Sequence, residues 1–290
     1  MKKIAALVAV SGLFLMACSG GESAASNPGE DLQSPDQGAV ESQDHPDFLR
    51  KMADPAHYVV NRNPGAGKSV LSTCGATDDA QYVNSYTGNL GVSKDYVNTY
   101  KPAVGAMEST ATAGANAKYC SGTLIGSNLF LTAGHCVDSS TVGDFVSFNY
   151  ERKANSTELL PEEHVRISAI VEDSLGGLDY AIVRLEGTPG TKYGTRATNA
   201  TDPATNSTLA IIQHPARRAK QIEAGTLASS SGNYHYYGNI DTQGGSSGSG
   251  ILNANGQLVG VHTNGGCTAS GGNNSGTRMS KIAAASAVIN

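Results

Sequence analysis

The stretch CSGTLIGSNLFLTAGHCVD, residues 120–138, holds the strongest pattern in this chain of 290 residues. Within it, the run LFLTA leads directly into His135, and Cys120 and Cys136 stand on either side of that run. A short β-prone run bounded by Gly, Asn and Ser predicts a strand. The sequence therefore predicts a strand whose carboxyl end presents a histidine beside a cysteine.

Short β-prone runs continue toward the carboxyl terminus. They are VSFNY (146–150), YAIVRL (180–185), TLAIIQ (208–213) and GILNANGQLVGVHT (250–263). In the last run, Asn255 and Gly256 separate two apolar segments, and both tolerate the positive φ of a tight hairpin turn. Repeated short strands with Gly and Asn between them predict an all-β sandwich or barrel. Only SKIAAASAVIN, at the end of the chain, has a pattern that favours a helix.

Three separate stretches carry side chains suited to nucleophilic catalysis. His135 lies in the first, Asp179 in GGLDYAIVRL, and Ser247 in DTQGGSSGSG. A serine hydroxyl attacks well only when an imidazole takes its proton, and the imidazole needs a carboxylate to fix its tautomer. A glycine-rich run lets main-chain N–H groups come close to a reacting oxygen. The sequence therefore predicts a Ser-His-Asp triad.

With the motifs TAGHC, LDYAIVRL and GGSSGS, residues 70–290 resemble the chymotrypsin-fold bacterial serine peptidases. Within them, the chain is most similar to the branch of glutamyl endopeptidases and exfoliative toxins. The resemblance implies an all-β fold of two antiparallel six-stranded barrels with a short C-terminal helix. It makes Ser247 the nucleophile, His135 the general base and acid, and Asp179 the orienting carboxylate. The N–H groups of Gly245 and Ser247 would form the oxyanion hole, and neither a cofactor nor a metal is expected.

Apart from Cys18, the chain has four cysteines. In an exported protein an even number favours two disulfides, and the spacing leaves three pairings open. The resemblance implies that Cys120 pairs with Cys136. Cys74 is then left to pair with Cys267.

The substrate pocket has two competing interpretations. His262 and Thr242 match the positions with which glutamyl endopeptidases bind an acidic P1 side chain, the residue before the cleaved bond. An imidazole can donate a hydrogen bond to such a carboxylate. Asp241 stands where trypsin-like enzymes hold the acid that binds Lys or Arg, so a basic P1 preference is the alternative. A small or apolar P1 residue is a third possibility, and the sequence favours the acidic one.

Other assignments remain open at this point. Asp173 is a rival orienting acid, and Ser246 and Ser249 are rival nucleophiles. From other classes of protein, the alternatives are an inactive binding protein on a peptidase scaffold and a structural lipoprotein with a Gly/Ser linker at 244–250. Labelling by a serine-directed reagent separates a peptidase from both.

The amino terminus has the pattern of an export signal. Two lysines precede a short apolar run, which predicts a lipoprotein-type signal peptide at residues 1–17. The run is shorter than the roughly 20 apolar residues that cross a bilayer. The letters LMAC at 15–18 resemble a bacterial lipobox, which predicts lipidation of Cys18. Ordinary signal cleavage nearby is the alternative.

Residues 18–69 are predicted to form a disordered tether or propeptide. Between residues 22 and 47 there are seven acids and no Lys or Arg, and such a segment buries too little apolar surface to order itself. We therefore expect an exported lipoprotein of the bacterial cell envelope, at the outer membrane or cell surface. Cleavage before Val70 would activate the zymogen and release the peptidase domain, residues 70–290.

The net charge of −5 gives no nucleic-acid footprint. The expected partners are protein or peptide substrates. Contact with a membrane would occur only through Cys18, and the resemblance favours a monomer.

Overall fold

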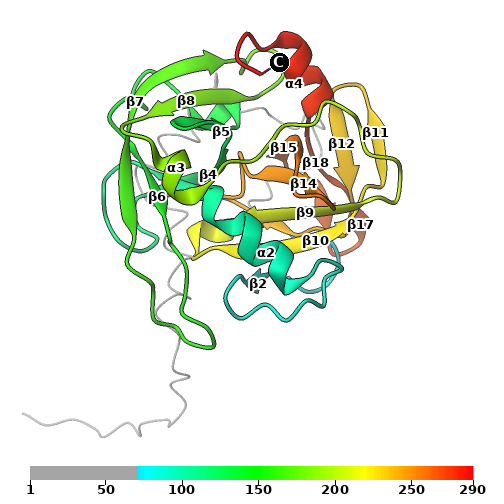
Figure 1. The fold of residues 1–290 in the computed structure, drawn as a ribbon. Helices are drawn as coiled ribbons and strands as arrows, with labels where there is room; N and C mark the ends of the chain where they lie inside the picture. The colour runs from blue at the N-terminus through cyan, green and yellow to red at the C-terminus, as the bar shows by residue number, and fades with distance from the viewer. Residues whose placement is uncertain (1–70, 290) are drawn as a thin grey trace, which may run out of the picture. The chain divides into compact units, whose positions relative to one another are not determined.

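The computed structural model describes residues 71–289. The predicted signal peptide, the lipidation site Cys18, the tether and Val70 lie outside the described residues. Figure 1 shows two β-structures, which are connected by residues 83–103 and 186–207.

The first β-structure is a closed antiparallel barrel with the strand order β3-β4-β5-β8-β7-β6. Its strands are β3 (Val104–Glu108), β4 (Lys118–Leu124), β5 (Leu129–Thr132), β6 (Phe145–Phe148), β7 (Glu163–Asp173) and β8 (Ala181–Leu185).

Apolar side chains fill the barrel at close range. The rings of Phe130 and Phe148 meet edge to face at 6.2 Å between centroids, and both are fully buried. A Cβ atom at Gly122 would lie only 2.3 Å from the Phe130 ring, so the absence of a side chain there lets the ring pack against the β4 backbone. The predicted barrel therefore closes around aromatic rings that need a glycine opposite them.

The second β-structure is an eight-stranded sheet that curves into a half-barrel, with the order β11-β12-β18-β15-β14-β9-β10-β2. Its strands are β2 (Gln81–Tyr82), β9 (Thr208–Gln213), β10 (Gln221–Thr226), β11 (Ser229–Ser231), β12 (Tyr234–Tyr237), β14 (Gly250–Asn253), β15 (Leu258–Asn264) and β18 (Asn274–Arg278). The all-β class and barrel architecture are confirmed, and the second sheet forms a half-barrel.

The predicted hairpin joins β14 to β15, with Gly256 at a φ of +70° in its turn. The turn packs on helix α2 (Lys94–Tyr100), where a Cβ at Gly256 would lie 2.0 Å from the Tyr100 ring. Helix α2 and the short α3 (Pro189–Tyr193) are additions to the predicted elements.

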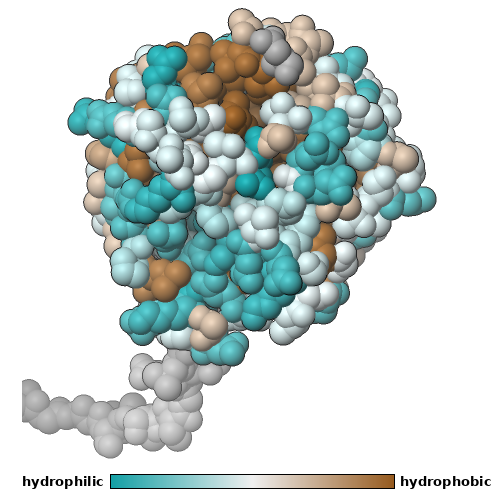
Figure 2. All heavy atoms as spheres, viewed as in Figure 1, coloured by the Kyte–Doolittle hydropathy of each residue, from teal (hydrophilic) through white to brown (hydrophobic). Residues whose placement is uncertain are grey.

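Helix α4 (Met279–Ala285) confirms the predicted C-terminal helix. The residues after it return to the first barrel, where Ser286 Oγ donates to Glu172 Oε2 over 2.6 Å. Figure 2 shows that apolar surface gathers beside α4 on this face. Within residues 71–289, no helix is both long and apolar enough to cross a membrane.

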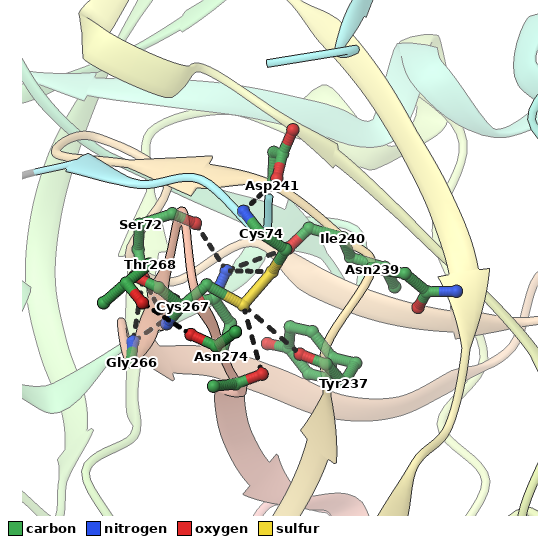
Figure 3. Close-up of a disulfide and its surroundings, with 12 residues drawn as sticks. Ser72, Cys74, Tyr237, Asn239, Ile240, Asp241, Gly266, Cys267, Thr268 and Asn274 are labelled. Atoms are coloured by element: carbon green, nitrogen blue, oxygen red, sulfur yellow. Dashed lines mark hydrogen bonds between the residues drawn. A yellow bond between two sulfur atoms is a disulfide. The ribbon is translucent and has the colours of Figure 1, made fainter. Parts of the chain in front are cut away.

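Both predicted disulfides are present, Cys74–Cys267 and Cys120–Cys136. The first closes a loop over a sequence separation of 193. In the chain-entropy account, a loop of that length restricts the unfolded chain by roughly 5 kcal/mol. The disulfide ties the start of the domain to the half-barrel next to Asn274 and Asp241 (Figure 3).

Two further pairs of very short strands complete the fold. They are β1 (Leu71–Ser72) with β13 (Thr242–Gln243), and β16 (Cys267–Thr268) with β17 (Gly271–Gly272). The first pair places the beginning of the described chain directly beside Thr242.

Candidate active site

His135 and Asp179 meet because their strands are neighbours in the closed barrel. His135 lies in the 3-10 turn η3 (Gly134–Cys136) just after β5, and Asp179 comes two residues before β8, which pairs with β5. Asp179 Oδ2 is 3.0 Å from His135 Nδ1, and Asp179 Oδ1 accepts the backbone N–H of His135 over 2.8 Å. The carboxylate therefore holds both the ring and the backbone of the histidine.

The backbone around this pair is shaped for the contact. Asp179 has a φ of +53°, a left-handed conformation that Asp tolerates better than most residues. A Cβ at Gly134 would lie 3.1 Å from Asp179 Oδ1 and 3.0 Å from the Leu175 Cα. Glycine at position 134 therefore keeps the approach of the carboxylate open.

The pair stabilises the charged form of the histidine. Burial is the largest influence on His135 and disfavours the imidazolium, but the charge and hydrogen bond of Asp179 outweigh it and leave the pKa of His135 raised. Burial likewise opposes ionisation of Asp179, and His135 overcomes it so that the pKa of Asp179 is lowered. Because Nδ1 is bonded to Asp179, Nε2 is the nitrogen left to exchange a proton with a substrate or nucleophile.

Ser247 lies in the loop between β13 and β14, which is bonded to the first barrel. Its carbonyl accepts the backbone N–H of Ser121 over 2.8 Å and lies 3.8 Å from Cys136 Sγ. Ser121 adjoins Cys120, and Cys136 adjoins His135, so the serine loop rests on the disulfide beside the histidine. The Ser247 residue itself is partly exposed.

Neighbouring atoms leave no space for a side chain at two glycines of this loop. Gly245 has a φ of +100°, and a Cβ there would lie 2.7 Å from the His214 carbonyl oxygen. Gly248 has a φ of +86°, and a Cβ there would lie 2.1 Å from Thr132 Oγ1. Within residues 71–289, no hydrogen bond takes up the backbone N–H of Gly245 or of Ser247, so both can donate to a ligand oxygen.

His262 on β15 lies against the same loop. Its backbone N–H donates to the Ser249 carbonyl, and its carbonyl accepts from Gly248, each over 2.8 Å. Its ring is buried, with Nδ1 2.6 Å from the Tyr237 hydroxyl. Burial is the main cause that lowers the pKa of His262 to about 3, and the charge of His135 adds to it.

Tyr237 sets the tautomer of this ring. Burial raises the pKa of the Tyr237 phenol well above its usual range, so the phenol keeps its proton and donates it to His262 Nδ1. The other nitrogen, Nε2, then carries the ring hydrogen. Tyr237 was not among the predicted site residues, although its place in the alternating run YHYYGN marks it as inward-facing.

The two remaining predicted pocket residues lie just before the serine loop. Thr242 is buried on β13, where it pairs with Ser72. The Asp241 carboxylate accepts the backbone N–H of Cys74 over 2.6 Å and that of Asp79 over 3.1 Å. Asp241 therefore holds the N-terminal segment against the half-barrel (Figure 3).

The rival residues have other surroundings. Asp173 is exposed and accepts the Leu175 N–H over 3.0 Å, whereas Asp179 contacts the histidine. Ser246 and Ser249 are fully buried, and Ser246 Oγ accepts the Gln243 N–H over 3.0 Å. Of the three serines in this loop, Ser247 has the most open position.

Comparisons with known proteins show which family and which folds the chain is similar to. Residues 120–261 match the family model described as a trypsin-like peptidase domain. The chain is 27% identical over 215 residues to Secreted RxLR effector protein 73 of Plasmopara viticola. This alignment covers 67% of this chain and 51% of that protein. It is 32% identical over 160 residues to exfoliative toxin A of Staphylococcus aureus, covering 49% and 55%. The chain thus spans about half the length of these curated relatives.

Two solved structures share the fold. One is the structure of Glu endopeptidase in complex with MPD, with a TM-score of 0.53, 22% identity, and coverage of 72% of this chain and 95% of that one. The other is the serine endoprotease from Yersinia pestis, with a TM-score of 0.50, 17% identity, and coverage of 65% and 63%. The described chain therefore has a chymotrypsin-like fold, and its residues 120–261 match the trypsin-like peptidase family.

Proposed function

We propose that this protein is a serine endopeptidase in which Ser247, His135 and Asp179 form the catalytic triad. The observation that carries the proposal is the buried Asp179–His135 pair, with Nδ1 bonded to the carboxylate, directly beside the loop of Ser247. The matched family supports the same chemistry.

In this mechanism, His135 Nε2 takes the proton of Ser247 Oγ as the oxygen attacks the substrate carbonyl carbon. Asp179 stabilises the imidazolium that forms. The N–H groups of Gly245 and Ser247 donate to the oxyanion of the tetrahedral intermediate, and loss of one such donor typically costs about 3 kcal/mol of transition-state stabilisation. The imidazolium then protonates the leaving amine, the C–N bond breaks, and an acyl-enzyme remains on Ser247. In the second half of the reaction, His135 takes a proton from water as the water attacks the acyl-enzyme. The proton then returns to Ser247 Oγ as the ester bond breaks and the acid product leaves.

Peptide hydrolysis tests the triad. We expect Ser247→Ala to reduce peptide hydrolysis to the low rate that remains without a nucleophile. Ser231→Ala, at an exposed serine of β11, should hydrolyse the peptide as fast as the parent. A chain that is folded but hydrolyses no peptide before any substitution would support the inactive binding protein instead.

For specificity, we propose a preference for an acidic P1 side chain bound by His262. The hydrogen bond from Tyr237 leaves Nε2–H as the donor of the His262 ring, and a bound carboxylate would share this donor with the Ser275 carbonyl. Because its pKa is lowered to about 3, the His262 ring is neutral when no substrate is bound. A bound carboxylate would accept a hydrogen bond from this ring, and its negative charge would favour proton uptake by the ring. Asp241 is less suited to a basic P1 residue because both of its carboxylate oxygens point toward the segment of Cys74 and Asp79, whose backbone N–H groups they accept.

A set of peptides that differ only at P1 distinguishes these pockets. We expect the highest kcat/KM with Glu or Asp at P1, and a selective loss of that preference in His262→Ala. Cleavage only after Lys or Arg, abolished by Asp241→Asn, would establish the basic pocket instead.

We further propose that the protein is exported and matures by cleavage before Val70. Relatives named as a secreted effector and an exfoliative toxin support export. The pairing of Leu71 and Ser72 with β13 supports maturation at this position, because it places the start of the described chain beside Thr242. The lipid anchor at Cys18 would hold the precursor at the cell envelope. N-terminal sequencing of active protein tests this, and an active form that begins at Cys18 would contradict release.

A further inference from the structure

Three carboxylates from distant parts of the chain gather beside the Cys74–Cys267 disulfide. They belong to Asp79 between β1 and β2, Glu223 on β10, and Asp241 just before β13. One oxygen from each lies within 4.8 Å of the others. Asp79 is exposed, which leaves the group open to solvent from one side.

Glu223 is the unusual member of this group. The residue is fully buried, and within residues 71–289 no N–H or hydroxyl donor bonds either of its carboxylate oxygens, which face the Asp79 carboxyl group. A buried carboxylate without a donor or a positive charge is strongly unfavourable. Burial above all, followed by the nearby Asp79, raises the pKa of Glu223 to about 10.

Other buried acids of the described chain show what Glu223 lacks. Glu108 and Glu162 lie 2.9 and 2.8 Å from Lys118 Nζ, so that acidic group already contains a cation. Arg218, which contacts the residue before Asp79, is paired with Asp78 over 3.0 Å. Among residues 71–289, the group around Glu223 therefore has three acids and no basic side chain bonded to them.

We propose that Asp79, Glu223 and Asp241 form a binding site for a calcium ion. Ca²⁺ prefers carboxylate and other oxygen ligands at 2.3–2.6 Å, so two oxygens on opposite sides of it lie up to roughly 5 Å apart. The three oxygens all lie within 4.8 Å of one another, which fits this requirement. The hydrogen bonds from Cys74 and Asp79 to Asp241 leave lone pairs on both oxygens, and water entering past Asp79 completes the coordination.

The ion would join three elements that are otherwise connected by a few bonds. It would hold the segment with Asp79 against β10 and against the residue before Thr242, close to the disulfide in Figure 3. Calcium is thereby expected to stabilise the start of the domain next to the predicted substrate pocket. This effect is independent of whether Ser247 is catalytic.

Calorimetric titration of the chelator-treated full chain with CaCl₂ tests the proposal. A Ser247→Ala background prevents self-digestion during the measurement. We expect one saturable site in this parent, and at least tenfold weaker binding in Glu223→Gln, which keeps the shape of the side chain without its charge. Asp78→Asn is the matched control, because Asp78 is bonded to Arg218 and Gln243, and it should bind as the parent does.

Thermal unfolding followed by circular dichroism provides the second measurement. Calcium should raise the Tm of the parent and of Asp78→Asn but not that of Glu223→Gln. If Glu223→Gln fails to fold, Asp79→Asn at the exposed ligand replaces it, with the same expected loss. Absence of saturable binding in the parent, or equal binding by Glu223→Gln and Asp78→Asn, would overturn the site. The first result would mean that a proton shared between Glu223 and Asp79 neutralises the group.

Discussion

Buried acids on the side of the closed barrel and those of the half-barrel have opposite surroundings. Glu108 faces Lys118, and Glu151 just after β6 faces Lys220 over 3.1 Å. In the half-barrel, Glu223 and Asp241 face each other and Asp79. The difference indicates that the first set is neutralised by the chain itself, whereas the second needs an ion or a proton from solution.

The largest effect is expected where a buried acid serves catalysis. Asp179→Asn keeps the shape of the side chain but favours the wrong tautomer of His135, so kcat should fall by roughly 10⁴-fold. Steady-state hydrolysis of the preferred peptide measures this. Asp173→Asn is the control, and an equal loss in both variants would contradict the assigned role of Asp179.

The raised pKa of His135 also predicts the acid limb of activity. Because Nε2 accepts a proton only when the ring is neutral, kcat/KM should fall as the pH drops below the pKa of His135, above its usual value of 6.5. In Asp179→Asn the residual activity should show this limb at lower pH. If the acid limb stayed at the same pH in Asp179→Asn, the group that titrates would not be His135 under the influence of Asp179.

The next effect concerns the neutralised acids of the barrel. Lys118→Met leaves Glu162 without its cation and Glu108 with only His164 as a partner, and we expect a loss of about 3–5 kcal/mol in the free energy of unfolding. Urea unfolding in the Ser247→Ala background measures it. Lys192→Met, which breaks only an exposed pair with Glu163, is the control. Equal stability of the two variants would contradict the comparison.

Glu151 gives the pH dependence of stability. Burial opposes its ionisation, but Lys220 and Lys101 outweigh burial and lower its pKa from 4.5 to about 2. Because the folded pKa is depressed, this stabilisation is present above pH 4.5 and is lost as the pH falls toward 2. Linkage puts the loss at about 3 kcal/mol.

Urea unfolding at several pH values between 5.5 and 2 checks this prediction in the Ser247→Ala background. Glu151→Gln should lack that part of the acid loss, whereas Glu158→Gln at an exposed position should retain it. Parallel pH curves for Glu151→Gln and its parent would show that Glu151 is not held by the lysines.

The smallest effect is expected at the predicted substrate pocket. Tyr237→Phe removes the donor to His262 Nδ1 and should lower kcat/KM for acidic P1 peptides roughly fivefold, in line with one lost hydrogen bond of about 1 kcal/mol. The ratio of acidic to neutral P1 cleavage is the decisive reading, because a general loss of stability would leave it unchanged. Tyr236→Phe, on the opposite face of β12, is the control.

Local sequence patterns were sufficient to predict much of the fold. The β-prone runs, the Asn255–Gly256 turn and the apolar C-terminal segment correspond to observed elements because each depends on neighbouring residues. Helix α2 was not predicted, since only Val97 in it is buried and its apolar pattern is weak. The strands β2 and β11 at the sheet edges have two and three residues, too few to show a period.

The candidate site was predictable in its residue types and less so in its contacts. Motifs around His135 and Asp179 identified two residues that the structure brings into contact. The role of Asp241 was not predictable, because its partner Cys74 lies 167 positions away in the sequence. Pairings of this kind depend on the whole fold, as does the gathering of Asp79 and Glu223 around it.

Mass-spectrometric mapping of a covalent adduct tests the central claim most directly. The protein is treated with a peptidyl phosphonate ester, digested, and sequenced by fragmentation to locate the modified residue. The account predicts one phosphonyl group on Ser247 Oγ, formed rapidly in the unmodified protein and lost in folded His135→Ala. Modification at another serine, or equally fast labelling without the imidazole of His135, would contradict it.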